Sequence, residues 1–135
     1  MAERLLSRVA KDENLHMIFY RNIVAAALEM APSQTMRAIT EEVVGFEMPG
    51  SIIPGFSRKA VQMAKAGIYD LRIHHDDIVS PLLRQWGVWD IEGLDEDGEK
   101  ARDELAAAVS ALDEEAARFV ERRAEAAAKK AARQS

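Results

Sequence analysis

Residues 3–30 read ERLLSRVAKDENLHMIFYRNIVAAALEM, an unbroken stretch without proline or glycine. Its large apolar side chains recur every three or four residues, which is the period of one face of a helix. The stretch therefore predicts a long amphipathic helix whose apolar stripe packs against other helices. The stripe consists of Leu5, Val9, Phe19, Ile23 and Ala27.

Three ionisable residues, Asp12, Glu13 and His16, interrupt this stripe. We expect them to face inward with it, and buried charged groups are normally paired or bound to a metal. Glu13 and His16 are three residues apart, so both can reach one ion from the same helix. Their oxygen and nitrogen donors suit iron, manganese or zinc, and Asp12 is placed to hold a ligating histidine. The plain alternative is an exposed helix with a stabilising Glu–His pair, because Glu-x-x-His is common in helices.

The remaining segments also predict helices, and none alternates as a strand does, so the expected fold class is all-α. Pro32 ends the first helix, and Ser33 is the expected N-cap of the second. Residues 48–55 hold two prolines and two glycines and predict a loop. A third helix is expected over residues 57–65.

Asp70 is the expected N-cap of a fourth helix, and Gly87 is its expected C-cap. Pro81 lies inside this helix and should kink it, because proline removes a backbone donor. The run HHDD at residues 74–77 looks like a ligand cluster. Adjacent residues point to different sides of a helix, however, which favours a polar turn with local hydrogen bonds. One face of this helix should carry Leu71, His74, Ile78, Leu82 and Trp86.

The acidic linker at residues 90–98 carries two glycines, so we expect it to be exposed. The last helix should begin near Asp95 or Glu99. Its apolar residues alternate four and three apart, which predicts packing along a neighbouring helix. These residues are Leu105, Val109, Leu112, Ala116 and Phe119. Residues 121–135 predict an Ala-rich basic tail that frays or projects, because alanine buries little area.

Composition excludes several classes of protein. The 135 residues include no cysteine, which excludes a disulfide framework, thiol catalysis and a thiolate-bound cluster. Residues 118–135 carry six positive and two negative side chains, although the whole chain has a net charge of −5. The body is therefore acidic, and nucleic-acid binding is not expected. We also expect no membrane span and no secretory signal, and hence a cytoplasmic protein.

The run AKDENLHMIFYR at residues 10–21 resembles the second Asp-Glu-x-x-His motif of the soluble acyl-carrier-protein desaturases, in particular their actinobacterial branch. Further matches follow in the family's order and cover the chain from about Ala2 to Phe119. They are Phe46-Glu47-Met48-Pro49-Gly50, Arg58-Lys59-Ala60-Val61, Gly67-Ile68-Tyr69-Asp70, and Gly93-Leu94 followed by Gly98-Glu99-Lys100-Ala101-Arg102-Asp103. On this likeness, residues 1–120 are the C-terminal portion of a desaturase domain and residues 121–135 are its tail.

The resemblance implies a ferritin-like four-helix bundle with two irons. In such a bundle two helices each give a Glu, and two others each give a Glu-x-x-His pair. It implies that Glu13 and His16 bind one iron, and that Asp12 hydrogen-bonds the opposing motif's histidine. The implied substrate is a fatty acyl chain on acyl carrier protein, desaturated with dioxygen and electrons from a ferredoxin-type donor. A homodimer is also expected.

The match to the family is to its C-terminal part only, and no second Glu-x-x-His occurs in the chain. Two protein ligands do not fix a two-iron cluster, so we expect a truncated member that is inactive alone. Two alternatives remain open. One is a non-catalytic helical module for interaction or oligomerisation. The other is a metal-binding oligomer in which symmetry-related Glu13 and His16 pairs hold a zinc or a single iron.

Overall fold

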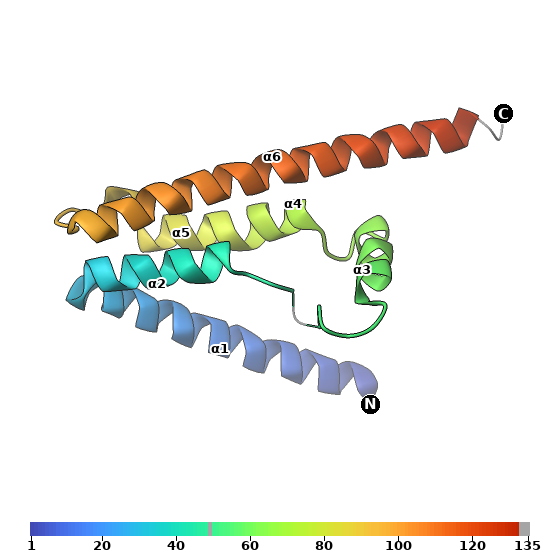
Figure 1. Ribbon diagram of the computed structural model, residues 1–135. Coiled ribbons are helices and arrows are strands. Elements are labelled where there is room, and N and C mark those ends of the chain that lie inside the picture. The colour runs from blue at the N-terminus through green and yellow to red at the C-terminus, as the bar shows by residue number, and fades with distance from the viewer. Residues whose placement is uncertain (49, 133–135) are drawn as a thin grey trace.

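The computed structural model describes residues 1–48 and 50–132, and every regular element in that part of the chain is helical (Figure 1). The predicted all-α class is confirmed. The elements are α1 (Ala2–Met30), α2 (Pro32–Val44), α3 (Phe56–Lys65), α4 (Leu71–Ile73), the π-helical turn η1 (His74–Val79), α5 (Ser80–Trp86), the 3-10 turn η2 (Val88–Asp90) and α6 (Glu96–Ala132). Figure 1 shows α1 and α6 on opposite sides of α2 and α5, with α3 across one end.

The hydrophobic core lies where α2, α5 and α6 meet. Its largest fully buried side chains are Met36, Leu83, Val88 and Leu105. The predicted seam of α6 is confirmed: Leu105 and Ala116 have no exposed surface, and Val109 and Leu112 pack against the core partly buried. The heptad spacing therefore places one side of α6 along α2.

A polar contact also joins α2 to α6. The Thr40 side chain is buried, and its hydroxyl lies 3.0 Å from the Met36 carbonyl oxygen and 2.9 Å from that of Ala101. One of these carbonyls belongs to α2 and the other to α6. Thr40 thus satisfies its own buried hydroxyl and fixes the position of one helix along the other.

Ser33 has a different role from the predicted one. Helix α2 begins at Pro32, and no side chain caps it. Instead the buried Ser33 hydroxyl accepts a hydrogen bond of 2.9 Å from the Asp95 backbone N–H. Gly98 lies against the same residue, since a Cβ atom at Gly98 would come within 3.1 Å of the Ser33 Cα. Ser33 therefore connects the start of α2 to the start of α6, a tertiary contact that local sequence does not encode.

The structure has a π-helical turn in the α4–η1–α5 segment, where the sequence predicted a kink at Pro81. The Ser80 backbone N–H donates to the carbonyl of His75, five residues earlier. Pro81 follows within the first turn of α5, where its missing N–H is tolerated. Two other predictions here are confirmed: the Asp70 carboxylate caps α4 by accepting from the Ile73 N–H at 3.0 Å, and α5 ends at Gly87, which is left-handed.

The far end of α6 extends past the other elements (Figure 1). All side chains of residues 121–129 are exposed, and the helix remains regular to Ala132. Arg123 fastens α6 to the α3–α4 corner, because it donates to the Lys65 carbonyl at 3.2 Å. The division at residue 120 stays a prediction. Predictions that concern Pro49 or residues 133–135 lie outside the described residues.

Candidate functional site

Asp12, Glu13 and His16 lie in the first half of α1. The Glu13 Oε2 and His16 Nδ1 atoms are 3.6 Å apart, one helical turn from each other. Both side chains are open to solvent, with exposed fractions of 72% and 64%, and Asp12 is exposed as well. The pair therefore presents one carboxylate oxygen and one imidazole nitrogen side by side on a free surface.

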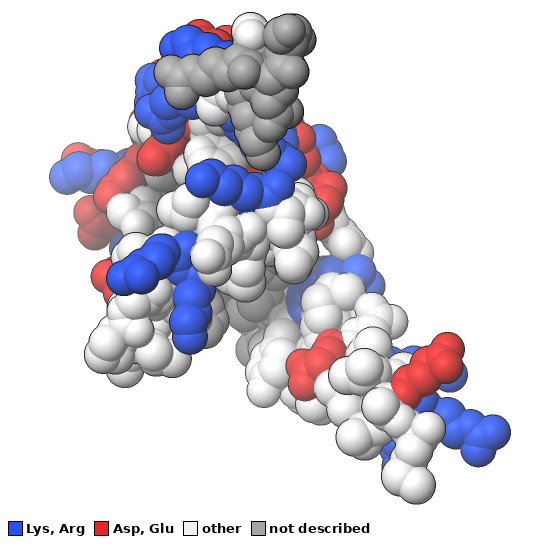
Figure 2. All heavy atoms as spheres, turned by 90° about the vertical axis from the view of Figure 1, so that its right-hand side faces the viewer, with Lys and Arg blue, Asp and Glu red and all other residues white. Residues whose placement is uncertain are grey.

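The prediction that these groups face inward is wrong within the described chain. Residues 1–17 are all exposed, because α1 packs only through its second half. There the Trp86 indole N–H donates to the Arg21 carbonyl at 3.0 Å, and Leu28 enters the core. The apolar part of the stripe is exposed too: Val9 to 47%, Phe19 to 60% and Ile23 to 48%. Figure 2 shows the free end of α1 standing apart from the rest at the lower right.

The Glu13–His16 pair fits part of a metal site. Its donor types are those that iron and zinc accept, and its spacing lets both residues bind one ion. Within the described chain no third ligating side chain joins them, since the only group of three or more lies elsewhere in the fold. Protein metal sites of this kind use at least three protein ligands. This helix alone therefore offers an incomplete set.

The other group consists of His75, Asp76 and Asp113, whose candidate ligand atoms lie within 4.8 Å of one another. The His75 Nδ1 atom is 2.7 Å from Asp76 Oδ1 and 4.0 Å from Asp113 Oδ1. Arg72 already engages both carboxylates, since it donates to Asp113 at 2.6 Å and to Asp76 at 3.1 Å. The hydrogen bond from His75, with a smaller contribution from Arg72, holds the pKa of Asp76 below its usual value. The group is thus an ion-pair network that fastens η1 to α6.

The local part of this network agrees with the predicted polar turn at residues 74–77. His75 bonds to its neighbour Asp76, and the Ser80 hydroxyl lies 3.1 Å from His75 Nε2. The bond from Arg72 to Asp113 was not predicted, because these residues are 41 positions apart and meet only when α6 packs on α4.

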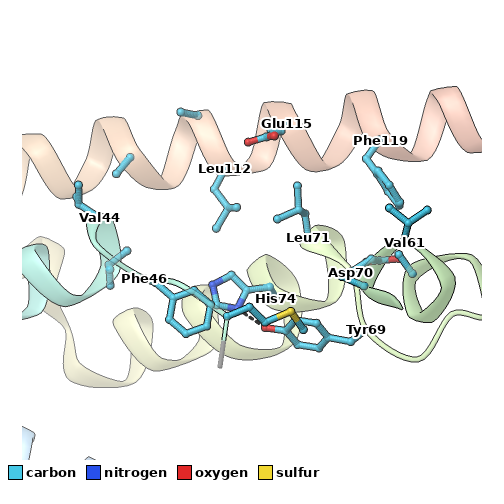
Figure 3. A pocket seen from close by; sticks show the side chains of 16 residues that line it. Val44, Phe46, Val61, Tyr69, Asp70, Leu71, His74, Leu112, Glu115 and Phe119 are labelled. Atoms are coloured by element: carbon cyan, nitrogen blue, oxygen red, sulfur yellow. Dashed lines mark hydrogen bonds between the residues drawn. The ribbon is translucent and has the colours of Figure 1, made fainter. Parts of the chain in front are cut away.

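A mostly apolar cavity of about 640 Å³ opens between α2, α3, α4 and α6 (Figure 3). His74 projects from η1 into its wall, stacked on the Phe46 ring with centroids 4.6 Å apart. The Tyr69 hydroxyl is 2.7 Å from His74 Nδ1, the bond that Figure 3 draws as a dashed line. Leu71, Leu112 and Phe119 line other parts of the cavity.

Burial favours the neutral forms of the polar pair in this cavity wall. Desolvation, with a smaller effect of the nearby His75 charge, lowers the pKa of His74 below 6.5. Desolvation likewise raises the pKa of the Tyr69 phenol above its usual value. A neutral imidazole and a neutral phenol can share one proton in a hydrogen bond without placing a charge among hydrocarbon. The sequence predicted that His74 lies on an apolar face, but it did not predict the contact of His74 with Tyr69.

Two comparisons with known proteins bear on this arrangement. The family described as "Fatty acid desaturase" matches residues 1–135. A protein of Mycobacterium tuberculosis (strain ATCC 25618 / H37Rv) named "Putative acyl-[acyl-carrier-protein] desaturase DesA1" is 42% identical over 113 residues, which cover 84% of this chain and 33% of that protein. The chain belongs to the fatty acid desaturase family. The resemblance of residues 10–21 and of the later motifs to acyl-carrier-protein desaturases is thereby confirmed.

More distant desaturases match over similar stretches. "Acyl-[acyl-carrier-protein] desaturase 7, chloroplastic" of Oryza sativa subsp. japonica is 30% identical over 112 residues, 77% of this chain and 28% of that protein. "Stearoyl-[acyl-carrier-protein] 9-desaturase 2, chloroplastic" of the same subspecies is 29% identical over 118 residues. The chain thus spans about a third of the length of the curated desaturases it matches.

The all-helical fold is consistent with part of the ferritin-like desaturase fold. No solved structure matches the chain. None of the helices in the described ranges is both long enough and apolar enough to cross a membrane.

Proposed function

We propose that this chain supplies the C-terminal helices of an acyl-carrier-protein desaturase, and that Glu13 and His16 are two of its iron ligands. One observation carries the proposal. In a chain matched by the desaturase family from residue 1 to 135, an acid and an imidazole stand 3.6 Å apart on a helix face that the rest of the chain leaves free.

The residues fit this role as part of a larger ligand set. Glu13 would bind iron through its carboxylate and His16 through its imidazole, both from α1. Asp12, one residue earlier, would accept the N–H of a histidine on an opposing helix and so fix that ring's orientation. The ferritin-like design needs further Glu and Glu-x-x-His helices to complete the site. When bound, the iron pair would supply dioxygen activation.

The substrate and partners follow from the family and are part of the same proposal. The relatives' names specify acyl-carrier-protein desaturases, so the substrate class is a fatty acyl chain carried on acyl carrier protein. The proposal also includes a ferredoxin-type electron donor, a homodimeric state and a cytoplasmic location. We further infer that the chain alone does not desaturate, because two donors on one helix do not hold two irons in a fixed geometry.

The test combines the chain with further helices of a relative. The chain is co-expressed with the segment of the mycobacterial relative that precedes the matched stretch, and the complex is assayed for bound iron and for acyl product lacking one pair of hydrogens. We expect iron and product from the complex, and neither from the chain alone. Glu13→Ala and His16→Ala should lose both signals, whereas Glu29→Ala, an exposed change on the same helix, should keep them. Full iron content in the Glu13→Ala, His16→Ala double variant would overturn the ligand assignment.

A second candidate function is a non-catalytic helical module for interaction or oligomerisation. The exposed apolar side chains of α1 favour it, because large apolar side chains gathered on one exposed face usually mark an interaction surface. This candidate predicts association that is independent of metal. This candidate is excluded if metal strengthens the association of the parent chain but not that of the Glu13→Ala, His16→Ala double variant.

A further inference from the structure

The two ends of the bundle differ in charge. Residues 48–69, which run through α3, contain three basic and no acidic side chains, and residues 118–135 contain six basic and two acidic ones. These segments together carry a net charge of +7, which leaves −12 for the other residues of a chain whose net charge is −5. Residues 90–99 alone contain six acids and no base. Figure 1 shows α3 and the second half of α6 at one end of the bundle, and the start of α6 at the other.

The positive charge around α3 is not neutralised by neighbouring acids. Arg58, Lys59 and Lys65 are exposed, and none of them forms an ion pair with another side chain of the described residues. Arg123, by contrast, lies 3.6 Å from Asp70 and donates to the Lys65 carbonyl, so that α6 is held to the end of α3. Figure 2 faces this end of the molecule and shows Lys and Arg atoms beside uncharged ones.

The same end carries large apolar side chains that project into solvent. Ile52 is exposed to 92% and Ile53 to 56% in the loop before α3, and Ile68 is exposed to 68% just after it. The loop is a series of hydrogen-bonded turns: the Ile53 N–H donates to the Gly50 carbonyl at 2.8 Å, and the Phe56 N–H donates to the Ile53 carbonyl at 3.0 Å. Gly50 has a φ of 95°, and the Phe56 ring lies against it. These turns hold the isoleucines away from the core.

We propose that this surface, residues 50–68, binds an anionic phospholipid membrane. The isoleucines of the loop would enter the boundary between headgroups and acyl chains, and the three cations of α3 would contact lipid phosphates. Basic and apolar side chains side by side on one exposed surface are the two features that place a protein on an anionic bilayer, and each is weak without the other. Glu13 and His16 take no part, so the proposal does not depend on the proposed function.

A lipid surface fits this end better than an acidic protein does. An acidic protein would satisfy the cations of α3, but it would need a pocket to cover an isoleucine at the tip of a projecting loop. Protein interfaces bury their apolar side chains in a closely packed centre. Lipid, in contrast, moves aside around a projecting side chain and closes over it. The isoleucine tip therefore decides between the two partners.

The charge separation also sets the orientation of the chain on the membrane. The negative surface potential attracts the α3 end and repels the acidic stretch of residues 90–99 at the opposite end of the bundle. Both effects present residues 50–68 to the lipid. Because the attraction acts over a Debye length of about 10 Å at 0.1 M salt, added salt should weaken binding.

Vesicle sedimentation of the full chain tests the charges. The chain should bind vesicles of phosphatidylcholine and phosphatidylglycerol in equal amounts about tenfold more tightly than vesicles of phosphatidylcholine alone. Arg58→Glu with Lys59→Glu should weaken binding to the anionic vesicles by about tenfold or more. Arg84→Glu with Lys100→Glu changes the net charge equally at exposed positions outside α3, and it should have a much smaller effect. Equal weakening by the two double variants, or no preference for anionic vesicles, overturns the proposal.

Insertion of the loop is tested against a matched apolar position. Met30, the last residue of α1, is exposed to 87% and lies at the end of the bundle opposite α3. Ile52→Asp should weaken vesicle binding by about fivefold or more, whereas Met30→Asp should weaken it far less. Since the chain has no cysteine, Ile52→Cys and Met30→Cys each accept a single environment-sensitive dye. Its emission should shift to shorter wavelength on anionic vesicles at position 52 alone. A shift at both positions or at neither contradicts the proposed insertion.

Two further outcomes would assign the surface to a protein. If the chain fails to bind anionic vesicles at low salt but binds acyl carrier protein, and Arg58→Glu with Lys59→Glu abolishes that binding, the surface docks an acidic protein and the lipid proposal is wrong. The co-expressed complex described above should bind anionic vesicles as the chain does. Binding by the chain but not by the complex would mean that other helices cover residues 50–68, which also overturns the proposal.

Discussion

The two halves of α1 have opposite surroundings. In the second half, Leu28 is buried in the core and the Arg21 carbonyl accepts a hydrogen bond from Trp86. In the first half, Leu5 is exposed to 63%, and the Glu13–His16 pair is exposed with it. The stripe from Leu5 to Ile23 stays exposed, whereas a neighbouring face of the second half, which carries Val24 and Leu28, packs inside the chain. The difference shows that the pattern specifies a face suited to burial, whereas the rest of the chain decides whether that face is covered.

The largest expected effect is a difference in stability loss between a substitution in the packed core and one in the free half of α1. Leu105 has no exposed surface, so Leu105→Ala should lower the free energy of unfolding by about 2–5 kcal/mol. Leu15 lies off the stripe and is exposed to 63%, so Leu15→Ala should change the free energy of unfolding by less than about 0.5 kcal/mol. Urea unfolding of both variants measures the difference. Equal losses would mean that the first half of α1 is packed in solution.

The contact between α2 and α6 should have a smaller effect. Thr40→Val removes the hydroxyl that lies near the Ala101 carbonyl, and we expect a loss of about 1–2 kcal/mol in urea unfolding. Thr35→Val is the matched control. The Thr35 hydroxyl donates only to the Ala31 carbonyl, one turn earlier, so its loss should matter less. If both variants lost the same stability, Thr40 would not connect the two helices.

The cap of α4 tests whether the packed region depends on local contacts as well. Asp70→Ala removes the acceptor for the Ile73 N–H and should lower the free energy of unfolding by about 1 kcal/mol. Asp70→Asn keeps an acceptor oxygen and should retain most of the stability. An equal loss for Asp70→Asn and Asp70→Ala would assign the effect to the ion pair with Arg123 instead.

His74 extends the comparison to pH dependence. Burial lowers the pKa of His74 below 6.5, so the unfolded chain binds more protons than the folded chain as the pH falls below this value. The free energy of unfolding should therefore decrease from there down to the lowered pKa of His74. His74→Gln should flatten this slope below about pH 6.5. A slope that survives His74→Gln would place its origin elsewhere.

Local features of the fold were predictable from the sequence because they depend on neighbouring residues. The extent of α1, the Asp70 cap and the glycine that ends α5 follow from spacing, side-chain acceptors and backbone freedom near each site. The α6 seam also follows, since its spacing is regular enough to mark one face.

Features that depend on distant residues were not predictable in the same way. Ser33 accepts from the N–H of Asp95, 62 residues away, and Arg72 reaches Asp113 across 41 residues. The π-helical turn changes the register of a helix whose residue types suggested only a kink. The candidate site shows both cases: the Glu13–His16 geometry follows from helical spacing, but its exposure depends on which helices lie beside α1.

The most direct test of the central claim is to locate iron in the molecule by anomalous diffraction. Crystals of the co-expressed complex, grown anaerobically with Fe²⁺, are measured at the iron absorption edge. We predict an anomalous peak within about 2.0–2.2 Å of a Glu13 carboxylate oxygen and a His16 ring nitrogen, the distances usual for such donors. A peak at the His75, Asp76 and Asp113 group, with none beside Glu13 and His16, would contradict the account.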